Sequence, residues 1–313
     1  MRRPLAAVLL LVALLVALAG CVDDGGAGGA GDIADRPVRA VATANFITDL
    51  ARVIGGDRAR VEGLMGPGVD PHLYRATAGD VSVLRRADIV FYGGLELEGR
   101  MADLLDEIGA TRATVAVTRD IPEERLRLPT EFEGRHDPHV WFSVPLWQVA
   151  ARTVAEAYAE LDPAHADGYR ARADAYLAEL EALDREVRAA IAAIPARSRV
   201  LVTSHDAFGY LGDEYGLDVV AIQGTSTATE ATTQDIERVA GVIADRGVRT
   251  VFIESSVPRQ TIDAVLAAAR RRGQEARVGG ELFGDAAGDA GTPEGTYVGM
   301  VRHNIGLIAA GLR

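Results

Sequence analysis

The sequence of 313 residues predicts an α/β protein of two lobes, each with a small parallel sheet flanked by helices, joined by one long spine helix. Three observations lead to this fold class. Short runs rich in β-branched residues alternate with helical patterns, this alternation occurs twice, and one uninterrupted helical pattern separates the two series. A chain of this length also exceeds a single average hydrophobic core, which favours two lobes.

The first twenty residues form a predicted signal peptide. Arg2 and Arg3 precede an almost unbroken apolar run that ends in "LAGC", the pattern of a charged region followed by a hydrophobic one. Cys21 is the single cysteine, and the small residues before it resemble a lipobox, in which cleavage leaves a lipid-modified cysteine. An ordinary signal peptide or an uncleaved anchor is the alternative, but an exported chain with one cysteine has no disulfide to form.

Residues 21–36 are predicted to be a flexible tether. Their sequence, "CVDDGGAGGAGDIADR", contains a run of glycine, alanine and aspartate without apolar periodicity. The glycines do not indicate a nucleotide-binding loop, because no strand precedes them and no helical pattern follows at once.

The N-terminal α/β lobe is predicted over residues 37–161. Strands are expected at four short apolar runs, 38–43, 60–65, 88–94 and 113–118. Helical patterns such as 47–55 and 79–87 lie between them, and another helix is expected to begin near Pro145. Strands that alternate with helices in this way pair in parallel.

Residues 162–195 are predicted to form the linking helix, and residues 196–313 the C-terminal α/β lobe. Asp162 is expected to cap the helix with Pro163 at its first position, and Pro195 to end it. About 30 residues at 1.5 Å each give roughly 45 Å, enough to run past both lobes; Gly168 is a possible break near its start. Strands are expected in the second lobe at 198–204, 217–223, 248–254 and 274–280.

The charge of the chain restricts its partners. A formal net charge of −12 argues against nucleic acid and suits a cationic ligand. All of the basic residues are arginine, so the chain has neither a P-loop lysine nor a Schiff-base lysine.

Four residues at expected strand ends and in stiff loops suggest a metal site. The tripeptide Asp-Pro-His occurs twice, in "GVDPHLY" and "HDPHVW", and supplies His72 and His139. His205 follows the strand "VLVTS", and Asp285 follows the last predicted strand. Ligands of parallel α/β sheets lie beyond the carboxyl ends of the strands. Three imidazoles and a carboxylate suit zinc and, less well, manganese.

Other residues are weighed against this set. His136 competes with His139 but is expected to be a solvated loop residue. The alternative for Asp285 is a turn residue in "GDAAGDAG", where Asp289 is a rival acid. Glu254, at the end of the strand "VRTVFIE", is a candidate to hydrogen-bond a metal-binding imidazole from behind, with an ordinary contact between the lobes as the alternative. His165 and His303 are expected at the surface or in helix packing.

Longer segments carry a resemblance to a known family. "MGPGVDPHLYRATAGDVSVLRRADIVFYGGLELEGRM", "DPHVWF", "LVTSHDAFGYLGDEYGL" and "GGELFGDAAGDAGTPEGTYVGMVRHN" resemble the zinc/manganese ABC-transporter solute-binding proteins of the TroA type. The resemblance implies one metal ion bound in the cleft between the lobes, with His72, His139, His205 and Asp285 as its ligands. It also implies delivery to an ABC permease and its ATPase, a monomer, and a lipid anchor on the outer face of the cell membrane, or on the periplasmic side where an outer membrane exists.

The chain departs from both metal subgroups of that family. Zinc-dedicated members often carry a long loop rich in histidine between the first two ligands, and here "RLRLPTEFEGRHDPHVW" adds only His136. Manganese-dedicated members often have glutamate where this chain has His205. The choice between zinc and manganese, or iron, stays open at this point.

Two other function classes are considered. A zinc-dependent hydrolase needs an open coordination position, whereas four protein ligands fill a tetrahedral ion; the sequence also has neither an HExxH nor a GxSxG motif. A surface adhesion lipoprotein is the stronger alternative, although no repeat or aromatic patch marks an interface. Release of the ion is expected to involve the glycine-rich surroundings of Asp285.

Overall fold

A four-stranded parallel sheet organises the first lobe of the computed structural model, which describes residues 33–132 and 134–313. Its strand order is β2-β1-β3-β4, with all neighbours parallel. The strands are β1 (Val38–Ala42), β2 (Ala59–Gly63), β3 (Ile89–Tyr92) and β4 (Ala113–Ala116). The helices that connect them are α2 (Asn45–Gly55), α3 (Ala78–Arg86) and α4 (Ala102–Gly109). All four strands predicted for this lobe are present.

The second lobe contains two parallel strand pairs, β5-β6 and β7-β8, and the inner strands β5 and β7 lie next to each other. The strands are β5 (Val200–His205), β6 (Asp218–Gln223), β7 (Thr250–Glu254) and β8 (Arg277–Leu282). The helices are α7 (Gly209–Tyr215), α8 (Thr233–Asp245) and α9 (Gln260–Arg271). The pairing of β7 with β8 shifts register between Val251 and Ile253. The four predicted strands are again present.

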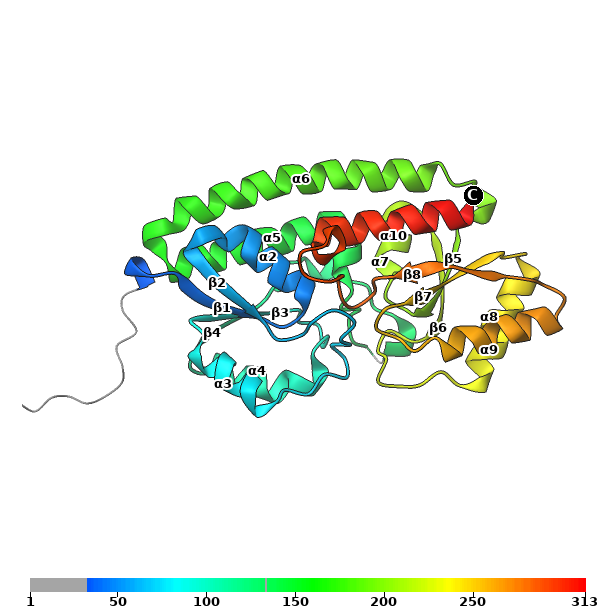
Figure 1. Ribbon diagram of the computed structural model, residues 1–313, viewed down its shortest axis with the longest axis horizontal. Coiled ribbons are helices and arrows are strands. Elements are labelled where there is room, and N and C mark those ends of the chain that lie inside the picture. The colour runs from blue at the N-terminus through cyan, green and yellow to red at the C-terminus, as the bar shows by residue number, and fades with distance from the viewer. Residues whose placement is uncertain (1–32, 133) are drawn as a thin grey trace, which may run out of the picture.

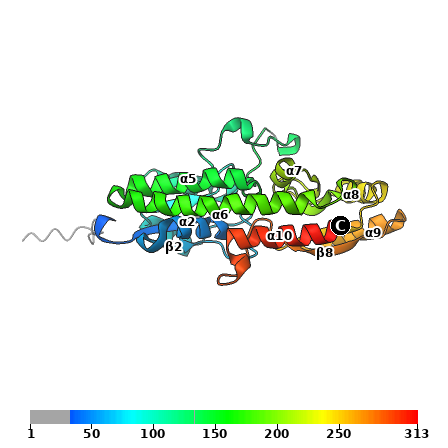
Figure 2. The ribbon, with the colours of Figure 1, turned by 90° about the horizontal axis from the view of Figure 1, so that it is seen from above.

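A long helix, α6 (Ala166–Ala192), runs along one side of both lobes, together with α5 (Val144–Leu161) and α10 (Tyr297–Leu312) (Figure 1). Seen from above, α5 and α6 lie side by side along the length of the molecule, and α10 lies beside α6 over the second lobe (Figure 2). The 27 residues of α6 span about 40 Å, and Gly168 does not interrupt the helix. Within the described residues, no helix has the length and hydrophobicity needed to cross a membrane.

The predicted capping role of Asp162 is wrong. A short 3-10 turn, Pro163–His165, precedes α6, and the carboxylate of Asp162 makes no capping hydrogen bond. It instead accepts hydrogen bonds from the guanidinium of Arg58 at 3.0 Å and the hydroxyl of Tyr169 at 2.9 Å. Arg58 lies far from Asp162 in the sequence, and Tyr169 lies in the first turn of α6. Local rules for helix capping therefore do not identify these two donors.

One hydrophobic core passes continuously from the first lobe through the long helices into the second. It includes Phe46 and Phe91 from the first lobe, Leu183 from α6, and Phe208 and Phe252 from the second lobe, all fully buried. Each lobe also contains one smaller core, which lies under its outer helices. The two lobes are therefore fused on the side that faces α6, and relative movement is easiest on the opposite side.

Candidate metal centre

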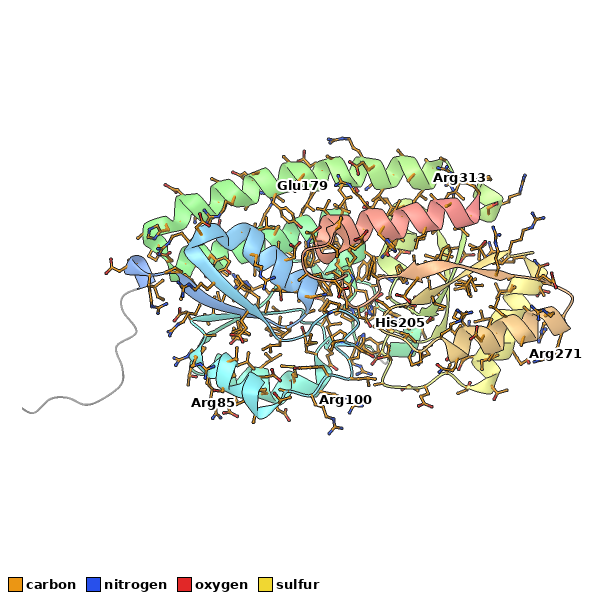
Figure 3. The ribbon with its side chains drawn as sticks, in the orientation of Figure 1. Arg85, Arg100, Glu179, His205, Arg271 and Arg313 are labelled. Carbon is orange, nitrogen blue, oxygen red and sulfur yellow. The ribbon has the colours of Figure 1, made fainter. Side chains whose placement is uncertain are left out.

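The four side chains selected from the sequence meet between the two lobes. The ligand atoms of His72, His139, His205 and Asp285 all lie within 4.8 Å of one another, and all four residues are buried. His205, labelled in Figure 3, lies near the middle of the molecule, where the ribbons of the two halves come together.

Strand ends and short loops position these residues. His205 is the last residue of β5, and Asp285 follows β8 by three positions. His72 lies in the loop after β2, and His139 directly precedes the 3-10 turn Val140–Phe142 that leads into α5. The carboxyl ends of parallel strands thus bring two residues from each half of the chain to one point, as expected for ligand sites of α/β sheets.

The separations match the edges of a metal tetrahedron. His72 Nε2 and His139 Nε2 are 3.3 Å apart, His139 Nε2 and Asp285 Oδ1 are 3.3 Å apart, and His205 Nε2 and Asp285 Oδ2 are 3.3 Å apart. Zinc–nitrogen bonds of about 2.05 Å give tetrahedral edges of about 3.3 Å. His72 Nε2 lies slightly farther, at 3.9 Å, from Asp285 Oδ2. Both carboxylate oxygens therefore face the imidazoles, and either can bind an ion.

The inner atoms also lack other partners. Among the described residues, no hydrogen bond reaches either carboxylate oxygen of Asp285 or the Nε2 of His205, although all three atoms are fully buried. Buried polar atoms are normally satisfied, because an unpaired polar group in a low-dielectric interior costs free energy. A divalent cation at the centre of the cluster supplies what these atoms lack, so the residues fit a metal ion.

Two further carboxylates contact the outer nitrogens of two imidazoles. Asp137 Oδ1 lies 2.7 Å from His139 Nδ1, and Glu254 Oε2 lies 2.6 Å from His205 Nδ1. Glu254 Oε1 also accepts the backbone N–H of His205 at 2.9 Å. The contact with His205 Nδ1 is an ion pair that lies off the line of an ideal hydrogen bond. A carboxylate behind an imidazole fixes the ring and directs its free Nε2 inward.

The Asp-Pro-His repeat has a structural explanation that the sequence reasoning missed. In each copy the aspartate accepts the backbone N–H of the histidine two positions later: Asp70 from His72 at 2.8 Å, and Asp137 from His139 at 2.9 Å. The intervening proline has no N–H to compete and restricts the backbone. The signal for Asp137 was therefore present in the motif itself.

The three imidazoles of the cluster differ in basicity. Burial lowers the pKa of His72 to about 3, so this ring is neutral over the physiological range. Burial also lowers the basicity of His139, but the carboxylates of Asp137 and Asp285 outweigh it and raise its pKa to about 9. The pKa of His205 is raised well above its usual value, because Asp285 and Glu254 overcome the effect of burial.

Asp285 shows the opposite shift. Burial alone would raise its pKa, but His205 and His139 hold it well below the usual carboxyl value. The carboxylate is therefore ionised and offers a full negative charge to a cation. This charge comes from the lobe opposite to His72 and His139, so it also attracts the two halves to each other.

The other candidates lie outside the cluster. His136 is half-buried, with Nε2 3.8 Å from Glu123, and Asp289 is exposed. His165 Nδ1 lies 2.9 Å from Asp162, and His303 on α10 lies 3.1 Å from the carbonyl oxygen of Glu281. Cys21 and the predicted signal peptide fall outside the described residues.

Gly284 sets the spacing behind His205. A Cβ at this position would lie 2.5 Å from Glu254 Oε2 and 3.4 Å from the His205 ring. We expect Gly284→Ala to displace the Glu254 carboxylate and weaken metal binding about tenfold, the range typical for loss of such an outer partner. Gly306→Ala on α10 is the matched control, because open space surrounds that glycine. Isothermal titration calorimetry would measure the metal affinity of both variants. Equal affinities would contradict the prediction.

The chain is similar to proteins that are named for metal uptake or metal binding. The family model described as "Zinc-uptake complex component A periplasmic" matches residues 40–311. The chain is 44% identical to the manganese-binding lipoprotein MntA of Bacillus subtilis, over 100% of both chains. It is 46% identical to the zinc-binding protein TroA of Treponema pallidum, over 89% of this chain and 90% of that protein. The solved structure of the periplasmic zinc-binding TroA superposes with a TM-score of 0.86 at 45% identity, covering 88% and 99% of the two chains.

Proposed function

The chain belongs to the family of zinc-uptake complex component A, and from this premise we propose that it captures one divalent transition-metal ion outside the cytoplasm and delivers it to an ABC permease. Such a protein is a binding component of an uptake system and not an enzyme. The observation that carries the proposal is the buried cluster of three imidazoles and an ionised carboxylate, in which both oxygens of Asp285 and the Nε2 of His205 have no hydrogen-bond partner among the described residues.

His72, His139, His205 and Asp285 are the proposed ligands. Four protein ligands complete a tetrahedral ion and leave no position for an activated water, which agrees with a carrier rather than a hydrolase. Asp137 and Glu254 are proposed to orient His139 and His205 through their Nδ1 atoms. The two relatives described above are named for metal binding, which favours uptake over the adhesion alternative.

The ion itself is proposed to be zinc or manganese, with zinc favoured in open competition. A site with three nitrogen donors follows the general order in which zinc binds more tightly than manganese. Both oxygens of Asp285 face the cluster, and such oxygen donors keep manganese acceptable. The relatives divide in the same way, since MntA is named for manganese and TroA for zinc.

Export and anchoring complete the proposal. Residues 1–20 are proposed to direct export, and Cys21 is proposed to carry the lipid. Residues 21–36 then connect the lipid to the folded part of the protein. That part consists of two lobes, at 37–161 and 196–313, which residues 162–195 link. The names of the relatives as lipoproteins support this arrangement. The partner is proposed to be the ABC permease with its ATPase, and the protein is proposed to act as a monomer.

Elemental analysis of the purified protein tests the function. We expect one equivalent of metal after native purification, loss of that metal with a chelator, and reloading from an equal mixture of zinc and manganese mainly with zinc. A folded protein that neither retains nor rebinds metal would rule out the receptor function, and preferential reloading with manganese would reverse the order of ions.

A further inference from the structure

One side of the metal centre is held by fixed contacts between the lobes. The side-chain amide of Asn45 on α2 donates to the carbonyl oxygen of Ala287 at 2.8 Å and accepts the N–H of Ala287 at 2.8 Å. The indole of Trp141 donates to the carbonyl oxygen of Gly284 at 3.2 Å. The segment around Asp285 is therefore bonded to the first lobe on both sides of the ligand, which does not favour the expectation that this segment moves.

Asp70 makes a further contact between the two lobes, next to the ligand His72. Asp70 Oδ1 accepts the backbone N–H of the ligand His72, and Asp70 Oδ2 accepts the hydroxyl of Thr227 at 2.6 Å. Thr227 belongs to the segment between β6 and α8, which passes along the edge of the molecule away from α6 (Figure 1). Asp70 thus joins a metal-ligand loop directly to the other lobe, on the side where the continuous core does not fuse the two.

The loop that carries His72 is the more exposed of the two Asp-Pro-His loops. Gly66, Pro67 and Gly68 are exposed, and Leu73 keeps 43% of its surface accessible. The other loop is buried from Asp137 to Val144. His72 also differs chemically, because no carboxylate of the described residues contacts its Nδ1, whereas His139 and His205 each have one.

Gly68 of this loop approaches the second lobe, and several buried hydroxyl groups lie at the strand ends of that lobe. Gly68 rests on the lobe, since a Cβ there would lie 3.5 Å from the carbonyl oxygen of Ser255. Among the described residues, the hydroxyls without a hydrogen-bond partner that lie at or just after strands of this lobe are Ser204, Thr225, Ser255 and Ser256. Buried hydroxyls of this kind are satisfied by water. On the other side, Trp141 and Phe46 pack with ring centroids 4.4 Å apart and exclude water.

We infer that the Asp70–Thr227 hydrogen bond is a latch over the route by which the ion enters and leaves, and that His72 is the ligand that moves when the latch opens. Asp70 is then a positioning residue that acts through His72. This inference rests on the proposed function and deepens it, because it identifies the contact that a permease must disrupt. The exposed residues of the His72 loop place the route on the side of the latch, whereas the packed rings of Phe46 and Trp141 close the other side.

Zinc dissociation from a Thr227→Val variant tests the latch. The substitution removes the hydroxyl, keeps the side-chain volume, and leaves the bond between Asp70 and His72 in place. We expect zinc release into excess chelator, followed by stopped flow, to accelerate about tenfold, the effect of losing one hydrogen bond to a charged group. The association rate should rise as well, because the latch opens in both directions, whereas a weakened ligand would change dissociation alone.

Two control variants separate the latch from general loosening. Thr229→Val removes an exposed hydroxyl from the same segment, and Ser143→Ala removes a bond between the lobes, to Glu214 at 3.0 Å, that does not involve the His72 loop. Both should keep the wild-type rates. The latch is wrong if Thr227→Val releases zinc at the wild-type rate or if Ser143→Ala accelerates release equally. Failure of the wild-type protein to bind zinc would instead overturn the proposed function.

Discussion

Replacing His205 by alanine is expected to reduce metal affinity by more than about 100-fold, beyond the loss typical of an outer partner. His205 is fully buried and is one of the three histidines proposed to bind the ion. Its removal also leaves Glu254 and Asp285 as two buried carboxylates without the imidazole that lay between them. Removing one member of a buried charged set destabilises a fold by roughly 3–5 kcal/mol, so the unfolding midpoint of the metal-free protein should fall at neutral pH.

The matched control for this substitution is His303→Ala. That ring lies on α10, outside the cluster, and is not fully buried. Zinc competition titration and thermal unfolding of both variants would check the prediction. Wild-type affinity in the His205 variant would remove this residue from the ligand set.

Metal affinity is expected to rise at least tenfold per pH unit between pH 6 and 8. His139 has a pKa of about 9 and His205 a pKa well above its usual value, so both rings carry protons at pH 7 before a metal ion binds. A metal ion binds only the neutral ring, so binding must release these protons, and each one contributes about a factor of ten per pH unit. The dependence on His139 should level off above pH 9, and His72, with a pKa of about 3, should contribute nothing.

Calorimetry in buffers of different ionisation enthalpy would count the released protons. We expect between one and two per zinc ion at pH 7. The Asp137→Asn variant should release fewer, because it removes the carboxylate that raises the pKa of His139. A count near zero would contradict the prediction. The same ion pairs stabilise the metal-free protein below pH 6.5, and the contribution of His139 is lost as the pH rises through about 9.

The sequence predicted the strands and the four cluster residues because both depend on local signals. Most strands are short apolar runs between helical patterns, and each cluster residue lies at a strand end or in a stiff loop, where the general rule for parallel sheets applies. The side chain of Glu254 was found as a candidate in the same way. Asp137 stands two residues before His139 but was not predicted to contact it, because the aspartate of the Asp-Pro-His motif was interpreted only as a turn residue.

Other features depend on contacts between distant parts of the chain. The bond from Thr227 to Asp70 spans 157 positions, and the bonds from Asn45 to Ala287 span 242. No periodicity or motif predicts such pairs, and they decide which side of the cluster is fixed and which can open. The arrangement of the second lobe as two strand pairs also depends on packing rather than on the pattern of any single strand.

The continuous core on the side of α6 has a consequence for repeated use. Small zinc domains lose their fold with their ion, because the ion supplies most of their folding free energy. Here Phe46, Leu183 and Phe252 belong to one buried cluster that contains no metal ligand. Emptying the site therefore leaves the carrier intact and ready to be filled again. The two lobes therefore keep their fold whether or not the ion is bound.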